Sequence, residues 1–418
     1  EAWGNVVVVT ATLLIVLLLT CLMSSSLRED IVSPLQKIMK LIQGLQEDPL
    51  SQLDTSALTT KKGVMEVSCV ANALSGLSYL IQMSFGEAGA QIIGSSLKDN
   101  KLDVDSSGKV VHALFGFCDI RNFTDLTEVL QEDVVRLVNN VGQIVHDAVV
   151  ANTGAPNKNI GDAFLLVWKP KGGDGVSIKH VAENALRSYI TIILEMQRDA
   201  GLLRWASMQG IQDRIPGYRV KLGFGLHYGW AVECAIGSHH KIDASYLSPH
   251  VNLSSRLEAA TKQYGVPVLI SGECHLLLPH DVKLLCRLVD RVTVKGSNTP
   301  LCLFTYDAPS LLCCHGSVPD ELDLSYDSLS MSDFWSACQP ETSETFRTTW
   351  AKAMVHYLGG VTGQTANWQS ARCYLERCLD MRPNDGPTRA ILDVLSSLSG
   401  EDGSAPLDWQ GYRVLTDK

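Results

Sequence analysis

The sequence lacks several features that mark common classes of protein. Its 12 cysteines include no C-x-x-C pair and are too few to crosslink a chain of 418 residues. We therefore expect reduced, mostly buried thiols in a reducing compartment. Basic residues are also not in excess, since 35 Lys and Arg stand against 45 Asp and Glu. Because nucleic-acid binding requires a positive surface, this balance argues against a nucleic-acid partner.

Two glycine-rich segments lack the spacing of nucleotide-binding loops. Residues 169–180 do not fit the G-x-x-x-x-G-K-[ST] pattern of a P-loop, and Gly223 and Gly225 form a G-x-G without the third glycine of a dinucleotide fingerprint. Charged residues make up only 19% of the chain and hydrophobic residues 45%. This composition excludes a disordered polyelectrolyte and is sufficient for a large core, and the length indicates two or three domains.

The N-terminal segment 1–24 contains an uncharged apolar run from Val6 to Met23. The run is at the short end of the lengths that span a bilayer. A signal peptide would be shorter and would carry a basic start and a small-residue cleavage site, whereas a buried core helix remains an alternative. Basic residues follow the run (Arg28, Lys37 and Lys40) and none precedes it, so we predict a membrane helix with the rest of the chain in the cytosol. The chain begins with Glu rather than Met, so we expect further N-terminal domains or subunits.

Two amphipathic helices are predicted between this run and the next domain. In segment 25–63, apolar residues are spaced by four and three positions after Pro34, at Ile31, Leu35, Ile38, Ile42 and Leu45. This pattern resembles the first helix of a HAMP-type signal relay, although a plain connecting helix would show it too. A linker covers 44–63. In segment 64–100, a second helix from Val64 to Ile81 would form a short coiled coil in a dimer.

Segment 108–307 alternates strands and helices. A buried strand at 111–120 precedes a helix over 134–148, and two short strands meet at a Gly161–Asp162 turn. A helix over 176–199 is followed by a pair of strands, 220–229 and 231–238, and then by a helix that ends at Gly265. This order predicts an α+β fold of the ferredoxin-like type.

The C-terminal segment 319–418 begins with a polar stretch and then becomes helical. Its apolar spacing resembles the second helix of a tetratricopeptide-like unit, at Trp368, Ala371, Leu375, Leu379 and Pro383. Since one such unit cannot bury its own apolar face, we expect it to pack on another domain in a structural role.

Two aspartates are the first candidates for chemistry. Asp119 ends the buried strand at 111–120 and precedes a turn into a helix, and Asp162 lies 43 residues later at the tip of the predicted hairpin. If the two strands are neighbours, the carboxylates converge, and two carboxylates around Mg²⁺ are typical of phosphoryl transfer. Taken singly, each residue would more often be a turn or cap aspartate.

Four segments resemble the successive signatures of class III nucleotidyl cyclases. They are FCDIRNFTDLTE (117–128), NKNIGDAFLLVW (157–168), GLHYGWAVECAIGS (225–238) and VNLSSRLEAATKQYG (251–265). The segments occur in the family's order and cover just under half of the chain. The segment around 85–89 and the C-terminal tail resemble membrane-bound cyclases of unicellular eukaryotes more than the vertebrate enzymes.

The resemblance implies a set of metal and phosphate ligands. Asp119, Asp162 and the carbonyl of Ile120 would hold two Mg²⁺ ions, for which Mn²⁺ can substitute. Phe123 and Thr124 would contact the substrate.

The resemblance also assigns the groups that bind the nucleotide. Lys158 would donate to adenine N1, where guanylate cyclases place a glutamate, and Ser245 would accept from the adenine amino group, so ATP is the expected substrate. Asn252 would orient the ribose, Arg256 would stabilise charge on the α-phosphate, and Lys295 would contact the terminal phosphates.

In the family, the metal carboxylates and the nucleotide-binding groups of one site come from different protomers. The chain carries both sets, which implies a homodimer with two shared sites. We therefore predict a membrane-anchored adenylate cyclase that makes cyclic AMP and pyrophosphate from ATP. The alternatives are a guanylate cyclase and an inactive cyclase-like signalling module.

Two departures from the family pattern concern loop geometry near Ser245. Ser248 and Pro249 replace a usual Gly and its neighbour, and residues 229–234 differ from the common G-x-V-V-x-G. Side chains in place of glycine can alter a turn.

Overall fold

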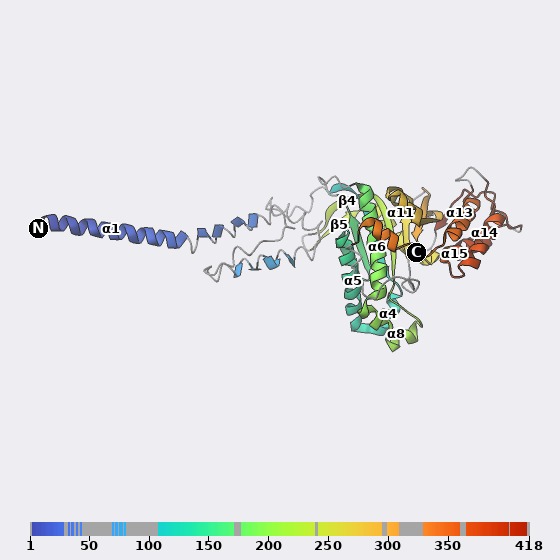
Figure 1. Cartoon of the computed structure of the whole chain (residues 1–418), viewed down its shortest axis with the longest axis horizontal. Helices are drawn as coiled ribbons and strands as arrows, with labels where there is room; N and C mark the ends of the chain where they lie inside the picture. Colours follow the sequence, from blue (N-terminus) through green and yellow to red (C-terminus); the bar gives the residue numbers. More distant parts are fainter. Residues whose placement is uncertain are drawn as a thin grey trace. The chain divides into compact units, whose positions relative to one another are not determined.

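The computed structural model describes residues 2–28, 108–170, 177–238, 241–294, 299–308, 329–359, 365–400 and 402–415, together with short helical pieces within 32–43 and 69–80 (Figure 1). The predicted linker at 44–63, most of the two amphipathic helices and Lys295 lie outside the described residues. The chain divides into two units, one of residues 1–108 with 233–245 and the other of 109–232 with 246–418.

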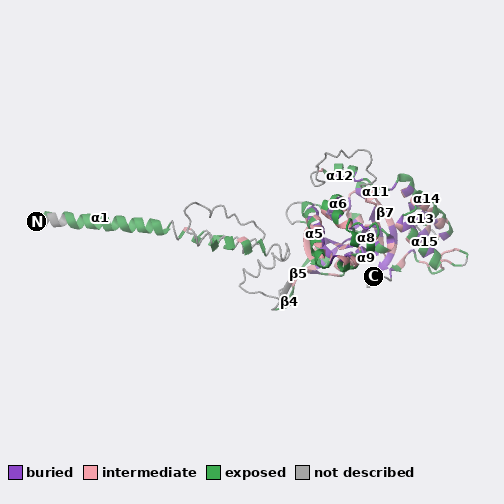
Figure 2. Ribbon diagram, turned by 90° about the horizontal axis from the view of Figure 1, so that it is seen from below, coloured by how far each residue is buried: buried purple, intermediate pink, exposed green. Residues whose placement is uncertain are grey.

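The first unit contains the apolar helix α1 (Ala2–Leu27). Its segment Val7–Leu27 has a mean hydropathy of 2.6 and is long and apolar enough to cross a membrane. The helix is exposed along its described length (Figure 2). Its threonines do not present free hydroxyls, because Thr12 and Thr20 donate to carbonyls one turn earlier in the same helix, at 3.0 Å to Val8 and Val16. The predicted N-terminal apolar helix is therefore confirmed as a helix.

One mixed sheet forms the centre of the second unit. Its strands are β1 (Lys109–Ile120), β2 (Ala155–Ile160), β3 (Ala163–Trp168), β4 (Leu222–Ser238), β5 (Lys241–Leu247), β6 (Val268–Ser271), β7 (Cys286–Val294), β8 (Leu301–Tyr306) and β9 (Arg413–Leu415). Their order is β2-β3-β1-β4-β6-β8-β7-β9, with β5 paired to β4. β4–β6 and β7–β9 are parallel, whereas the β1–β3, β2–β3, β6–β8 and β7–β8 pairs are antiparallel. The predicted α+β fold is confirmed.

Helices cover this sheet and extend beyond it. They are α4 (Phe123–Leu130), α5 (Val134–Ala151), α6 (Ile178–Arg198), α7 (Ala200–Ala206), α8 (Gln209–Arg214), α9 (Pro249–Tyr264), α10 (Gly272–Leu277) and α11 (His280–Leu285). Periodic apolar residues on α5, such as Leu137, Val141 and Val145, are buried in one core with Tyr189 of α6 and Phe224 of β4. The predicted helices at 134–148 and 176–199 are thus present, while the short helices α7 and α8 were not predicted.

The C-terminal helices belong to the same unit as the sheet. They are α12 (Met331–Ala337), α13 (Glu344–Leu358), α14 (Trp368–Met381) and α15 (Gly386–Leu398). A second core combines Trp350 and Trp368 of this tail with Leu257 of α9, Val289 of β7 and Leu303 of β8. The final strand, β9, then adds to the edge of the sheet beside β7. The helical tail therefore packs on the sheet domain, as predicted, but the added strand was not foreseen.

The prediction of two separate strands at 220–229 and 231–238 was wrong. Residues 222–238 form the single strand β4, and Gly229 in its middle does not turn the chain. The glycine is needed for close approach instead, because a Cβ atom there would overlap the ring of His250 on α9. A glycine in a strand pattern can mark either a turn or such a contact, and the local sequence does not distinguish them.

Candidate metal and substrate site

The two predicted metal aspartates lie side by side. β1 and β3 are antiparallel neighbours, with Asp119 opposite Ala163, the residue that follows Asp162. The backbone N–H of Ile120 donates to the carbonyl oxygen of Asp162 at 3.3 Å. Gly161 takes a left-handed conformation with φ of 66°, which forms the tight β2–β3 turn that carries Asp162. The carboxyl end of β1 and this turn therefore meet at one place, as the sequence predicts.

The electrostatics of this pair favour a divalent cation. Burial raises the pKa of the Asp119 carboxyl, and the nearby Asp162 carboxylate raises it further, against Lys262 and Arg121, which lower it. Burial also raises the pKa of Asp162, which its own backbone and Lys262 lower. Neither carboxylate has an ion-pair partner among the described residues. Two adjacent, partly desolvated carboxylates carry negative charge that a cation would neutralise.

The described residues contain no group of three or more His, Cys, Asp or Glu side chains that could hold a metal ion. Asp119 and Asp162 supply two hard carboxylate oxygens, and Ile120 lies between Asp119 and the turn into α4. A set of so few protein oxygens suits Mg²⁺, which usually keeps water and substrate phosphates among its ligands. The donor set therefore fits a magnesium-type ion better than a zinc or calcium site.

An ion pair behind the aspartates holds the loop after β1 and was not predicted. The Arg121 guanidinium lies 2.8 Å from the Glu258 carboxylate and also donates to the Thr261 hydroxyl. Burial raises the pKa of Glu258 to about 7, although Arg121 lowers it. The Tyr218 hydroxyl donates to the Arg121 carbonyl at 2.9 Å, and the Arg121 N–H donates to the Lys221 carbonyl at 2.9 Å. The loop that follows Asp119 and Ile120 is thus anchored to α9 and to the residue before β4.

The same close packing between β4, the Arg121 loop and α9 requires glycine at positions 223 and 225. A Cβ atom on Gly223 would overlap the Arg121 guanidinium, and one on Gly225 would overlap the Ser254 carbonyl of α9. The G-x-G that fails as a dinucleotide fingerprint therefore lets α9 lie close against β4. A glutamate on the buried face of a helix, two residues after Arg256, is the one sequence signal that could have indicated the ion pair.

The predicted substrate contacts at the start of α4 differ in exposure. Asn122 precedes the helix in a left-handed conformation, with φ of 59°. Phe123 packs against the core, whereas Thr124 is exposed. Thr124 is thus accessible to a substrate, and Phe123 contributes mainly by fixing the first turn of the helix.

Helix α9 has two faces with different roles. Asn252 and Arg256, four residues apart, are both exposed. Ser254, Glu258 and Thr261 are buried against the rest of the domain. The pair predicted to bind the nucleotide therefore points away from its own domain.

The departures from the family pattern stabilise the start of α9. Ser248 has φ of −168°, an extended conformation open to any residue, and its hydroxyl accepts from the His250 N–H at 3.0 Å. Pro249 occupies the first turn, where its fixed φ suits a helix. The same Ser248 hydroxyl donates to the Trp230 carbonyl at 2.5 Å. The serine thus caps the helix and ties it to β4.

His250 continues this attachment into the sheet. A hydrogen bond of 2.7 Å joins its Nδ1 to Nε2 of His227, whose Nδ1 lies 2.8 Å from the Ser271 hydroxyl. Burial, together with His250, lowers the pKa of His227 to about 3, so the pair is neutral at physiological pH. This connection fixes the helix end that carries Asn252.

The remaining predicted nucleotide contacts are distributed over the β2–β3 and β4–β5 hairpins. Lys158 lies on β2, half-buried and opposite Leu165 of β3. Ser245 lies on β5 and belongs to the first unit. Lys295 lies outside the described residues. The structure thus brings Asp119 and Asp162 together and places Asn252 beside Arg256, while the roles of all these residues remain predictions.

Comparisons with known proteins agree with this arrangement. Residues 109–306 match the family of adenylate and guanylate cyclase catalytic domains. Residues 1–98 match the family described as the all-helical domain of RasGEFs, a range in which α1 is the longest described element.

Individual relatives point to the same segment. The chain is 30% identical over 196 residues to an adenylate cyclase of Anabaena cylindrica, covering 46% of this chain and 36% of that protein. It is 27% identical over 191 residues to adenylate cyclase 1 of Rhizobium meliloti, covering 45% and 26%. A solved bacterial light-regulated adenylyl cyclase is 20% identical, with a TM-score of 0.45, over 59% of this chain and 66% of that one. The matched segment therefore spans between about a quarter and about a third of the length of these curated relatives.

Proposed function

Because residues 109–306 form a class III cyclase catalytic domain, we propose that this chain is a membrane-anchored adenylate cyclase that converts ATP into 3′,5′-cyclic AMP and pyrophosphate. The observation that carries the proposal is the convergence of Asp119 and Asp162 at the end of β1, in a domain whose helix α9 presents Asn252 and Arg256 outward.

Asp119, Asp162 and the Ile120 carbonyl would hold two divalent cations, Mg²⁺ or Mn²⁺. When bound, the ions would neutralise phosphate charge and lower the pKa of the ribose 3′-hydroxyl. In the reaction, the 3′ oxygen bonds to the α-phosphorus, the bond to pyrophosphate breaks, and the hydroxyl proton leaves to solvent. No side-chain base is assigned.

Asn252 would hold the ribose in line for this attack, and Arg256 would stabilise the charge that grows on the α-phosphate. Lys158 and Ser245 would bind the adenine, and Lys295, Phe123 and Thr124 would complete the substrate site. Lysine at 158 can donate to adenine N1, which is why ATP is preferred over GTP in the proposal.

The outward direction of Asn252 and Arg256 supports a homodimer. The buried face of α9 contacts the chain's own β1 loop through Glu258 and Thr261. The exposed face is available to the metal site of a second copy. Asn252 and Arg256 of that second copy would in turn reach the metal site of the first. Each dimer would then contain two shared sites.

The exposure of α1 supports the membrane anchor. Apolar side chains along the helix, such as Leu14 and Leu17, are 67% and 64% exposed. A helix of this length that is exposed among the described residues is more stable in a bilayer than in water. The catalytic domain would then lie in the cytosol.

The test uses the full chain in lipid nanodiscs, supplied with ATP or GTP and with Mg²⁺ or Mn²⁺. We expect cyclic AMP from ATP and much less cyclic GMP from GTP. Preference for GTP would make the chain a guanylate cyclase, and no product with either nucleotide would indicate an inactive signalling module.

A mixing experiment tests the shared sites. Asp119→Ala and Asn252→Ala homodimers should each be nearly inactive. Mixed before assembly, they should recover roughly a quarter of wild-type activity, since about half of the dimers then hold one intact site of two. A mixture of Asp119→Ala with Asp162→Ala is the matched control and should recover nothing. Equal behaviour of the two mixtures would contradict the shared-site arrangement.

A further inference from the structure

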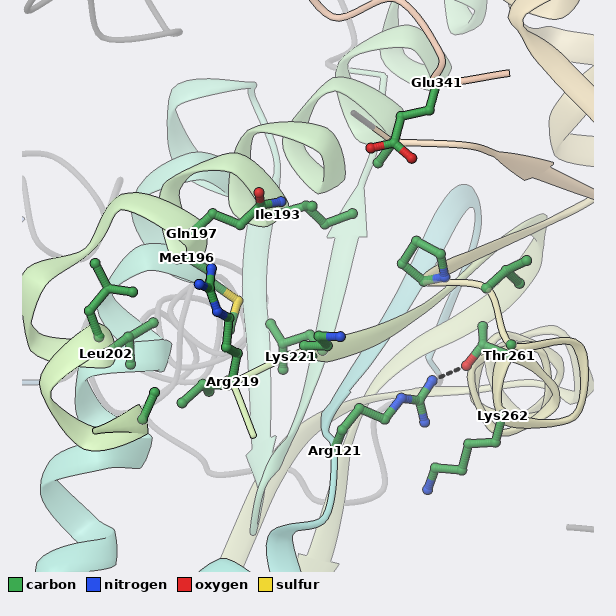
Figure 3. A pocket seen from close by; sticks show the side chains of 18 residues that line it. Arg121, Ile193, Met196, Gln197, Leu202, Arg219, Lys221, Thr261, Lys262 and Glu341 are labelled. Carbon is green, nitrogen blue, oxygen red and sulfur yellow. Dashed lines mark hydrogen bonds between the residues drawn. The ribbon is translucent and has the colours of Figure 1, made fainter. Parts of the chain in front are cut away.

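A cavity of about 700 Å³ lies behind the loop that follows β1 and does not include the predicted catalytic residues. Its apolar wall comes from α6, α7 and the segment before β6, through residues such as Ile193, Met196, Leu202, Val266 and Pro267 (Figure 3). This volume lies in the range of small-molecule sites, which are mostly apolar with a few placed polar groups.

Four cationic side chains line the same cavity, from three parts of the chain. Arg121 follows β1, Arg219 and Lys221 precede β4, and Lys262 lies near the end of α9 (Figure 3). Glu341 is the one acidic residue in the lining, and it pairs with Arg382 at 3.4 Å. The lining therefore carries a clear excess of positive charge.

Three of these cations have no acidic partner in the described parts of the chain. Arg121 is paired with Glu258. Arg219, Lys221 and Lys262 form no ion pair with any residue that the structure describes, and all three are exposed. The cavity thus combines an apolar wall with uncompensated positive charge, which is complementary to a molecule with an anionic group on an apolar body.

We propose that this cavity is a binding site for a small organic anion, a phosphate or carboxylate group carried on an aromatic or aliphatic body. The apolar body would contact α6 and α7, and the anionic group would lie between Arg219, Lys221 and Lys262. Gln197 also lines the cavity and would add a polar contact. The site is separate from the nucleotide site of the proposed function, and its occupancy does not depend on cyclase activity.

Binding is tested by calorimetry on the full chain in nanodiscs with 1-naphthyl phosphate as the probe. We expect the double variant Arg219→Gln/Lys221→Gln to weaken binding at least tenfold, since both positions are exposed and lie at the cavity. The control Lys179→Gln/Lys352→Gln removes two exposed cations elsewhere and should change affinity less than twofold. Equal losses in both double variants would overturn the site, because they would indicate non-specific attraction.

Two further comparisons separate the cavity from other sources of binding. Inorganic phosphate and 1-naphthol, which each supply half of the probe, should bind at least tenfold more weakly, and equal affinity for either would contradict an amphipathic site. Ala206→Phe, which fills the cavity, should abolish binding with little change in melting temperature. The Asn252→Ala/Arg256→Ala variant should bind the probe normally, and a loss there would place the probe in the nucleotide site instead.

Because the calorimetry does not require catalysis, failure of the anion site and failure of the cyclase proposal remain distinguishable.

Discussion

Two groups of acidic residues in this chain have opposite surroundings. At the junction between sheet and tail, Arg287 lies 2.7 Å from both Asp307 and Asp385, and Arg413 lies 2.8 Å from Asp290. At the end of β1, Asp119 and Asp162 lie beside one another, and neither forms an ion pair within the described structure. The first group joins the tail to the sheet domain, whereas the second keeps its charge available.

The pKa directions of Asp385 and Asp119 express the same difference, whereas at Asp290 burial raises the pKa despite the opposing effect of Arg413. Burial raises the pKa of Asp385, but the charge and hydrogen bonds of Arg287 outweigh it, so that the net pKa is lowered. Burial raises the pKa of Asp119, and a second carboxylate adds to that effect. A buried acid that the fold has neutralised is structural, while a pair of acids held together without a counter-ion indicates a site for an external cation.

The largest expected effect separates the two groups by activity. Asp119→Asn and Asp162→Asn should each lower cyclase activity by about 10³-fold, or about 4 kcal/mol of transition-state stabilisation. Their melting temperatures should stay equal or rise, because mutual repulsion is removed. Asp385→Asn should instead lower the melting temperature. Its cyclase activity should be retained when it is assayed well below that temperature. Activity assays with thermal melts check this, and a destabilised Asp119→Asn protein would remove the distinction.

The next effect concerns stability at the tail. Arg287→Ala leaves Asp307 and Asp385 without their shared cation, so we expect a loss of about 3–5 kcal/mol in the free energy of unfolding. Arg136→Ala is the matched control, since Arg136 and Asp133 form a 3.6 Å pair with side chains 79% and 53% exposed. That variant should lose less than about 1 kcal/mol. Similar losses in a thermal melt would show that the tail charges contribute no more than surface pairs.

A third test uses Glu258, which is paired with Arg121 yet has its pKa raised from 4.5 to about 7 by burial. The folded state therefore binds the Glu258 proton more tightly than the unfolded state does. The contribution of this proton to the free energy of unfolding is complete below pH 4.5 and is lost as the pH rises through about 7, by up to about 3 kcal/mol. Glu258→Gln does not titrate, so its melting temperature should not show this fall. Parallel pH profiles of variant and wild type would mean that Glu258 is ionised throughout.

The smallest effect comes from His227, which forms a hydrogen bond with His250. Its pKa is lowered from 6.5 to about 3, so its stabilising contribution is present above pH 6.5 and falls as the pH drops. At pH 5.5 the loss should be about 1.4 kcal/mol, measured as the melting difference between wild type and His227→Gln. A difference that stays constant from pH 7.5 to 5.5 would contradict a neutral His227–His250 pair.

The sequence predicted more of the local elements than of their connections. The β1 strand, the β2–β3 hairpin and the helices α5, α6 and α9 follow from apolar periodicity and from Gly161 and Gly265, both at positive φ. The Arg121–Glu258 pair could not be found in this way, because neither residue has a local pattern that names its partner. Helix α7, which forms part of the cavity wall, was not predicted because it is too short to show an apolar periodicity.

The sequence alone determined the apolar helix α1, the alternation of strands and helices, and the two aspartates, one at the end of β1 and one in the turn after β2. Each of these depends on residues that are neighbours in the chain, so local preferences and spacing are sufficient to predict them. The tertiary structure decided that β4 continues through Gly229, that β9 joins the sheet, and that Arg121 pairs with Glu258. These features arise from contacts between distant segments, and only the packing of the whole domain determines which segments meet.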